Sequence, residues 1–96
     1  MKYYFSPEAK FEIKESEQFY NNEQPGLGRE FLLEVRHAAG AITENPEVWQ
    51  KTYKDFRRYF LPRFPFYIIY RIHTGTIEIT SVSHNKRRPG HWKERL

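Results

Sequence analysis

The fourteen residues SHNKRRPGHWKERL at positions 83–96 hold the side chains of this sequence that are best suited to chemistry or to ligand binding. His84 and His91 could each transfer a proton near neutral pH, because an unperturbed imidazole titrates near ~6.5. The basic triplet at residues 86–88 lies between them and suits phosphate or carboxylate groups. The segment could therefore be a disordered basic tail, a nucleic-acid contact or part of an active site.

Trp92 favours a folded tail over a disordered one. Its indole offers a large apolar area that offsets the entropy lost on ordering the segment. Pro89 and Gly90 supply the turn that this needs. We expect Trp92 to fold back against the sheet or a helix, which would hold the basic triplet at one rim of the sheet; a base-stacking role is the alternative.

Metal-free RNA cleavage is one reaction that these residues could support. It needs a base for a 2′-hydroxyl, an acid for a 5′-oxygen and cations that stabilise the charge on phosphorus. His84 or His91 could be the acid or base, and a capping or hydrogen-bonding role is the alternative for either histidine. The charge could come from Arg57, Arg58, Arg71, Lys86, Arg87 or Arg88. If the protein is a nuclease, the candidate catalytic residues are His84, His91 and Arg71. The four histidines are scattered and the chain has no cysteine, so we expect no metal site and no cofactor.

Charge is divided unevenly along the 96 residues, whose net charge is +4. Residues 1–50 hold five Lys/Arg and nine Asp/Glu, a balance of −4, whereas residues 51–96 hold eleven and three, a balance of +8. Clustered positive charge attracts phosphates and acidic protein segments, so the partner site is expected in the second half. The candidate binding residues are Lys51, Lys54, Arg58, Arg71, Lys86, Arg87, Arg88 and Trp92.

Periodicity predicts one α+β domain over residues 1–96, of which 84–96 form the basic C-terminal segment. A strand at 2–5 precedes a helix from Pro7 to about residue 22, and a second helix with apolar residues every three or four positions ends at Asn45-Pro46. Strands follow near 56–61, 66–72 and 77–83, which places Lys51 and Lys54 in a loop. The order β-α-α-β-β-β indicates a helical hairpin packed on a small, mainly antiparallel sheet. The second helix should bury Phe31, Val35, Ala38 and Ile42.

Neighbouring residues on the predicted strands should point to opposite faces of the sheet. Arg57 and Arg58 therefore cannot both belong to one site. Along 66–72, one alternating set must face the helices, and the other would place Tyr67 and Arg71 on an open face.

The composition also indicates in which cellular compartment the protein is expected. The absence of cysteine excludes disulfides and is compatible with a reducing environment. No run of eighteen apolar residues occurs, and the first ten residues lack the apolar region of a signal peptide. We expect a cytoplasmic protein without a membrane partner.

The complete pattern resembles the RelE/ParE superfamily of bacterial type II toxins. The similar stretches are FSPEA, FYNNEQPGLGREFLLEV, ITENPE, FRRYFLPRFPFYIIYRI and HNKRRPGHWKERL, and among them PGLG, RFPFYIIYRI and the spacing H-x-x-R-x-P-G-H-W look like the ParE branch. The resemblance implies a growth-inhibiting toxin that binds and poisons DNA gyrase and is neutralised by a cognate antitoxin. The alternative that it implies is a RelE-like, ribosome-dependent mRNA endoribonuclease. We expect the antitoxin to contact Arg58, Arg71 and Arg87.

Overall fold

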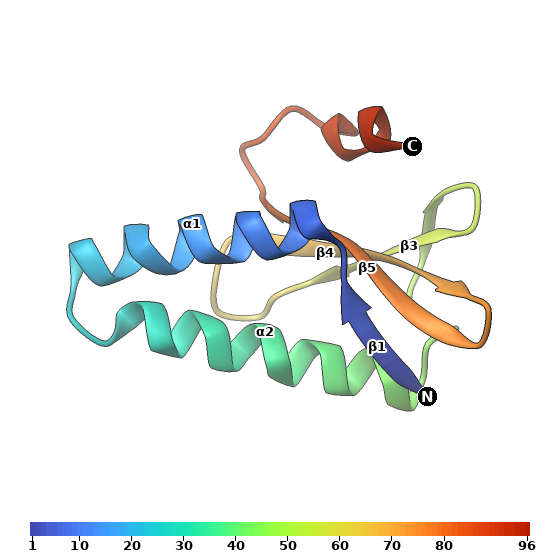
Figure 1. Ribbon diagram of the computed structural model, residues 1–96, viewed down its shortest axis with the longest axis horizontal. Coiled ribbons are helices and arrows are strands. Elements are labelled where there is room, and N and C mark those ends of the chain that lie inside the picture. Colours follow the sequence, from blue (N-terminus) through green and yellow to red (C-terminus); the bar gives the residue numbers. More distant parts are fainter.

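A helical hairpin packs on a five-stranded sheet (Figure 1). The computed structural model describes residues 1–96. The helices are α1 (Pro7–Glu23) and α2 (Leu27–Glu44). The strands are β1 (Lys2–Phe5), β2 (Lys51–Tyr53), β3 (Phe56–Phe60), β4 (Phe66–His73) and β5 (Thr76–His84), and a short 3₁₀ helix, η1 (His91–Arg95), follows. The predicted α+β class and helical hairpin are confirmed.

The strand order in the sheet is β1-β5-β4-β3-β2, in which β1 pairs with β5 in parallel and every other pair is antiparallel. The prediction of a loop before β3 was wrong, because Lys51 lies in the additional strand β2 and pairs with Arg57. Lys54 does lie outside the strands, in the tight turn between β2 and β3, with φ at +50°. A strand of three residues is too short to show alternation, which explains why periodicity missed it.

The start of the first helix follows from local chemistry. Ser6 is the N-cap of α1, and its hydroxyl accepts a hydrogen bond from the Ala9 amide at 3.1 Å. Pro7 occupies the first helical position, where a missing N–H costs nothing. The observed start of the helix at Pro7 agrees with the sequence prediction.

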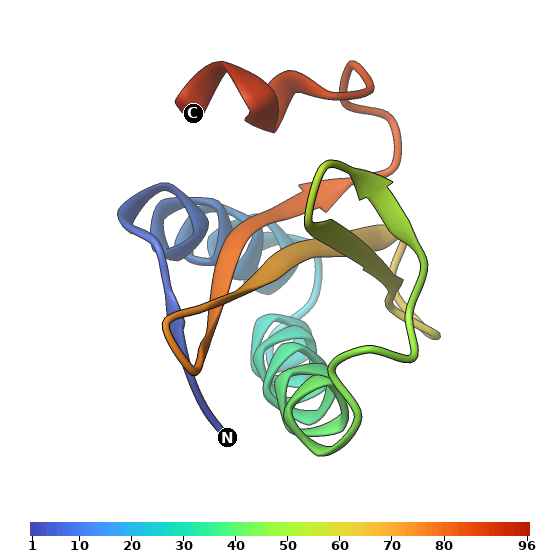
Figure 2. The ribbon, with the colours of Figure 1, turned by 90° about the vertical axis from the view of Figure 1, so that its right-hand side faces the viewer.

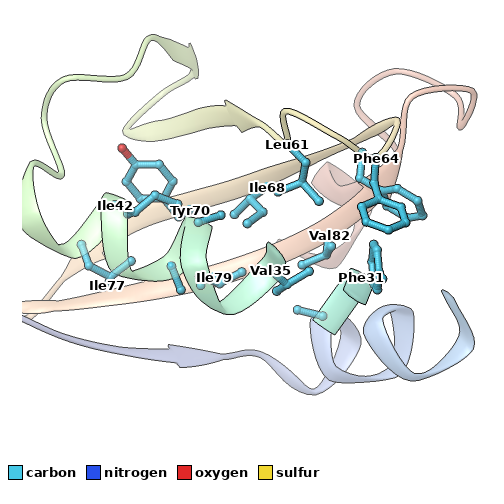
Figure 3. Packing of buried hydrophobic residues seen from close by; sticks show 14 residues of the cluster. Phe31, Val35, Ile42, Leu61, Phe64, Ile68, Tyr70, Ile77, Ile79 and Val82 are labelled. Carbon is cyan, nitrogen blue, oxygen red and sulfur yellow. The ribbon is translucent and has the colours of Figure 1, made fainter. Parts of the chain in front are cut away.

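The main core lies between α2 and the sheet (Figure 3). Phe31, Val35, Ala38 and Ile42 are all buried there, as predicted. They pack against Ile68, Tyr70, Ile77, Ile79 and Val82 of the central strands. This core holds β4 and β5 at the centre of the sheet, and the opposite face of β4 lines the candidate site.

A β-bulge in β5 sets which residues face the tail. Ile69 pairs with Ser81 but Tyr70 pairs with Ile79, so Thr80 is the extra residue. The bulge reverses the alternation, and Ile79 and Val82 consequently both join the helix-facing core. Simple alternation along β5 would not have placed these two side chains on one face.

The C-terminal segment covers the other face of the sheet (Figure 2). In that view η1 and α2 lie on opposite sides of the sheet. Trp92 is 2% exposed and forms a small second core with Phe56, Tyr67 and Ile69. The predicted fold-back of Trp92 is confirmed, and the face that the sequence predicted to be open is partly closed by this tail.

Candidate functional site: a basic pocket under the C-terminal segment

A basic pocket opens between the sheet and the C-terminal segment. Its volume is about 360 Å³, and β3 and β4 supply one wall while residues 85–93 supply the other. Arg58, Arg87 and Lys93 line it, and no carboxylate does. The remaining lining residues are Thr52, Phe60, Tyr67, Ile69, Asn85, Pro89, Gly90 and Trp92. Three cations beside an apolar floor make this pocket suited to an anionic group attached to an apolar or aromatic one.

Aromatic contacts hold the tail that forms the pocket. The Trp92 ring lies 5.0 Å from the Phe56 ring and 5.9 Å from the Tyr53 ring, measured between centroids. The Lys93 ammonium lies 4.4 Å from the centroid of the Tyr53 ring, at a distance suited to a cation–π contact. The Tyr53 ring therefore contacts both the Trp92 indole and the Lys93 ammonium.

A buried carboxylate on α1 ties the other end of the tail to the sheet. Glu12 is 6% exposed, and it accepts hydrogen bonds from the Val82 amide at 3.0 Å and from the Arg95 guanidinium at 2.5 Å. Arg95 also donates to the Thr80 carbonyl at 2.9 Å, and an Arg87 nitrogen lies 3.6 Å from Glu12. Glu12 is thus the carboxylate that holds both ends of residues 87–95. A carboxylate on a helix is expected to be exposed, and Glu12 is buried because these partners surround it.

His91 is buried inside this arrangement. Its Nε2 lies 2.8 Å from the Ser83 hydroxyl, which in turn contacts the Ser81 hydroxyl. Burial lowers the pKa of His91 below its ordinary value, and the nearby Arg87 guanidinium lowers it further, while Glu12 opposes both effects. A buried, hydrogen-bonded and neutral histidine stabilises the folded tail.

Acidification should therefore weaken the tail. Because the pKa of His91 is lower in the folded protein than in the unfolded chain, the unfolded chain binds more protons as the pH falls through ~6.5. The stability conferred by neutral His91 is complete above that pH and is lost below it. Protonated His91 would lie near the positive charges of Arg87, Arg88 and Arg95, and Glu12 is the anion that would oppose their repulsion. Urea unfolding at about pH 7.5 and about pH 5.5 should show a larger loss for the wild type than for His91→Gln, which keeps a hydrogen-bonding group beside Ser83. Equal losses would contradict this role for His91.

His84 lies on another surface. Its Nδ1 accepts a hydrogen bond from the Lys86 amide at 3.0 Å, and its ring packs edge-on against Phe66 at 5.1 Å. It lines a separate cavity of about 560 Å³ between α1 and β5, to which Arg87 also contributes. The two histidines are therefore not brought together into one site.

Arg71 is also separate from the basic pocket. Its Nε donates to Glu78 at 2.6 Å, and its guanidinium lies 5.0 Å from the Phe56 ring centroid. Arg71 does not line the pocket that contains Arg58 and Arg87. The structure therefore does not gather the three predicted catalytic residues, His84, His91 and Arg71.

The other candidate binding residues are partly assembled. Arg58 faces the pocket, with its guanidinium 4.9 Å from the Phe60 ring, whereas Arg57 turns away and donates to the Trp49 carbonyl at 2.7 Å. This is the predicted division between the two neighbours. Lys51, Lys54 and Lys86 are exposed outside the pocket, and Arg88 pairs with Glu94.

Sequence reasoning missed several residues of the pocket. Lys93 follows Trp92 directly, so the predicted fold-back was the signal that could have placed it. Tyr67 was expected on the same face as Arg71 but was not chosen as a site residue. Thr52 and Asn85 had no distinguishing pattern.

The comparison with protein families decides the family. A family model described as the ParE toxin of type II toxin-antitoxin system, parDE, matches residues 3–89. The chain belongs to the ParE toxin family. The ParE-family chain is also similar to a solved structure from the chromosomal ParDE TA system from P. aeruginosa, with a TM-score of 0.78 and 14% sequence identity over 88% of this chain and 95% of that one. At that identity the likeness supports the fold alone.

No curated protein sequence matches this ParE-family chain significantly. Neither helix has the length and apolar character that a membrane crossing requires. Membership of the ParE family makes the chain a toxin of a type II toxin–antitoxin system and implies an antitoxin partner.

Proposed function

We propose that this ParE-family toxin inhibits growth by binding and poisoning DNA gyrase through the basic pocket, and that a cognate antitoxin neutralises it. The observation that carries the proposal is the pocket itself, in which Arg58, Arg87 and Lys93 converge without a histidine or a carboxylate. Such a site is equipped to bind an anionic surface. General acid–base catalysis would instead need a group that exchanges a proton with the substrate.

The two histidines offered for catalysis do not line the basic pocket. His91 is buried against Ser83, and His84 lines the cavity on the α1 side of β5. A candidate base must come within hydrogen-bonding distance of the proton that it removes. These positions favour inhibition by binding over RNA cleavage by His84 or His91.

One observation favours the alternative, a ribosome-dependent mRNA endoribonuclease. Tyr67 lines the basic pocket together with Arg58 and Arg87, and a phenol can take part in proton transfer. The substitution Tyr67→Phe removes only the hydroxyl and keeps the ring that packs in the second core. A nuclease that uses this hydroxyl would lose about 10²-fold or more in activity, whereas an inhibitor that acts by binding would keep most of its potency.

Induction of the toxin in bacteria tests the proposal. Growth should stop, gyrase-trapped double-strand breaks should form within minutes, and mRNA should stay intact; co-expression of the antitoxin encoded beside the toxin gene should restore growth. Cuts at codon-defined positions in mRNA without DNA damage would instead establish the endoribonuclease. Normal growth at verified levels of folded toxin would contradict both functions.

A further inference from the structure

An exposed aromatic ring lies beside the cations of the basic pocket, on the side of the sheet opposite α2 (Figure 2). Phe60 lines the pocket and is 56% exposed. The Arg58 guanidinium lies 4.9 Å from the centroid of the Phe60 ring, and the Tyr67 ring lies edge-on to it at 6.0 Å. The pocket therefore offers a ligand an aromatic surface as well as positive charge.

Positive charge continues from the pocket to the turn between β2 and β3. Lys93 lines the pocket, and its ammonium lies 4.4 Å from the centroid of the Tyr53 ring. The Lys54 ammonium lies 5.2 Å from the same centroid. Neither lysine lies within 4.0 Å of a carboxylate. Together with Arg58 and Arg87, these lysines form a positive path that is longer than a single anionic group requires.

Cations that alternate with aromatic rings are typical of surfaces that bind single-stranded nucleic acid. The backbone of the strand follows a positively charged groove, and its unpaired bases stack on aromatic side chains. The pocket volume of about 360 Å³ lies at the small end of the range for ligand pockets, which suits a single nucleotide. Asn85 and Thr52 line the same pocket, and their side chains are of the types that hydrogen-bond to base edges.

An acidic protein segment would use only part of this surface. Its carboxylates could pair with the cations of the pocket, but they would leave Phe60 and Asn85 without a partner. A DNA duplex offers phosphates, but its bases are stacked inside the helix and cannot reach the Phe60 ring. An unpaired nucleotide, which has a phosphate, a ring and a hydrogen-bonding edge, matches all three features of the pocket.

We infer that the basic pocket binds an unpaired nucleotide of the DNA on which gyrase acts, with the phosphate held by the three cations of the pocket and the base against the Phe60 ring. The next phosphate along the strand would lie at Lys54. The inference rests on the proposed function, which supplies DNA as the source of the strand; an RNA strand has the same binding chemistry. It adds that the toxin engages the complex of gyrase and DNA through the DNA.

Binding to a fluorescent single-stranded DNA oligonucleotide, followed by anisotropy, tests the contact with the base. Phe60→Ala should bind the strand about fivefold or more weakly than the wild type, because stacking on the ring is lost. The matched control is Phe11→Ala, since Phe11 is 63% exposed on α1 and does not line the pocket. Equal affinities of these two variants would overturn the inference, as would a duplex of the same sequence that binds the wild type as tightly as the single strand does.

The salt dependence of the same binding tests the contact with the second phosphate. Lys54→Gln should reduce the slope of log Kd against log salt concentration by about 0.7, the contribution of one phosphate contact on a single strand. Lys2→Gln removes the same charge from β1, at the opposite edge of the sheet, and should leave the slope unchanged. An equal slope for the two variants would exclude Lys54 from the path of the strand.

Two functional assays identify the source of the strand. Phe60→Ala should inhibit purified gyrase about fivefold or more weakly than Phe11→Ala does. If the wild type instead stops cell-free translation and leaves gyrase active, the strand is mRNA, and both the DNA source and the proposed function fail. If the wild type inhibits gyrase but binds no DNA strand, the inference fails while the proposed function stands, with an acidic surface of gyrase as the ligand.

Discussion

Replacement of Trp92 by alanine should lower the free energy of unfolding by about 3–5 kcal/mol, the usual cost of truncating a large buried aromatic residue. Trp92 is 2% exposed, and its loss would uncover Phe56, Tyr67 and Ile69 on the second face of the sheet. The same change would release the wall of the basic pocket that contains Lys93. Toxicity should therefore fall together with stability. Urea unfolding followed by circular dichroism measures the first effect.

Leu96 provides the matched control for this experiment. It lies in the same C-terminal segment but is 58% exposed, so Leu96→Ala should change the free energy of unfolding by no more than about 0.5 kcal/mol. The variant Trp92→Phe should retain part of the stability, because a smaller ring can still contact Phe56. A loss for Trp92→Ala no greater than that for Leu96→Ala would show that the tail does not pack on the sheet.

Glu12→Gln should cost on the order of 3 kcal/mol, because it leaves the Arg95 guanidinium without a counter-charge in a mostly buried position. The Glu12 side chain is 7% exposed and that of Arg95 is 17% exposed, so water would compensate little. Glutamine has nearly the same shape as glutamate, and the effect therefore reports charge and hydrogen bonding more than packing. Chemical denaturation of the variant beside the wild type provides the measurement.

Glu15→Gln is the control on the same helix. Glu15 is exposed and forms no ion pair within 4.0 Å, so its replacement should be nearly neutral. Glu12→Gln should also weaken toxicity, because Glu12 holds Arg87 and Arg95 at the two ends of the tail. Equal stability of the two variants would contradict the role given to Glu12.

The sequence predicted the hairpin and the central strands because periodicity is a local property. Phe31, Val35, Ala38 and Ile42 recur at helical spacing, and a pattern of this kind is preserved whatever the helix packs against. The bulge at Thr80 could not be predicted in this way, because a bulge depends on pairing between two strands. The contacts of Ser83 with His91 and of Ser81 with Ser83 were unpredictable for the same reason.

The candidate site was only partly predictable for a related reason. Trp92 and its fold-back followed from the apolar area of one residue. The burial of Glu12 depends instead on Arg95, which is distant along the chain, and a charged residue on a helix is expected to be exposed unless its partner is known. The roles of His84 and His91 could not be predicted either, because the position of a histidine in the fold, rather than its residue type, decides whether its imidazole can reach a substrate.

Inhibition of purified DNA gyrase in a supercoiling assay tests the central claim most directly. The wild-type toxin should inhibit supercoiling, and Arg58→Gln/Lys93→Gln should be about tenfold or more weaker, because both residues line the basic pocket. The control Lys2→Gln/Arg29→Gln, which removes the same charge outside the pocket, should inhibit like the wild type. Unimpaired supercoiling in the presence of excess folded wild-type toxin would contradict the account, as would equal inhibition by the pocket variant and the control.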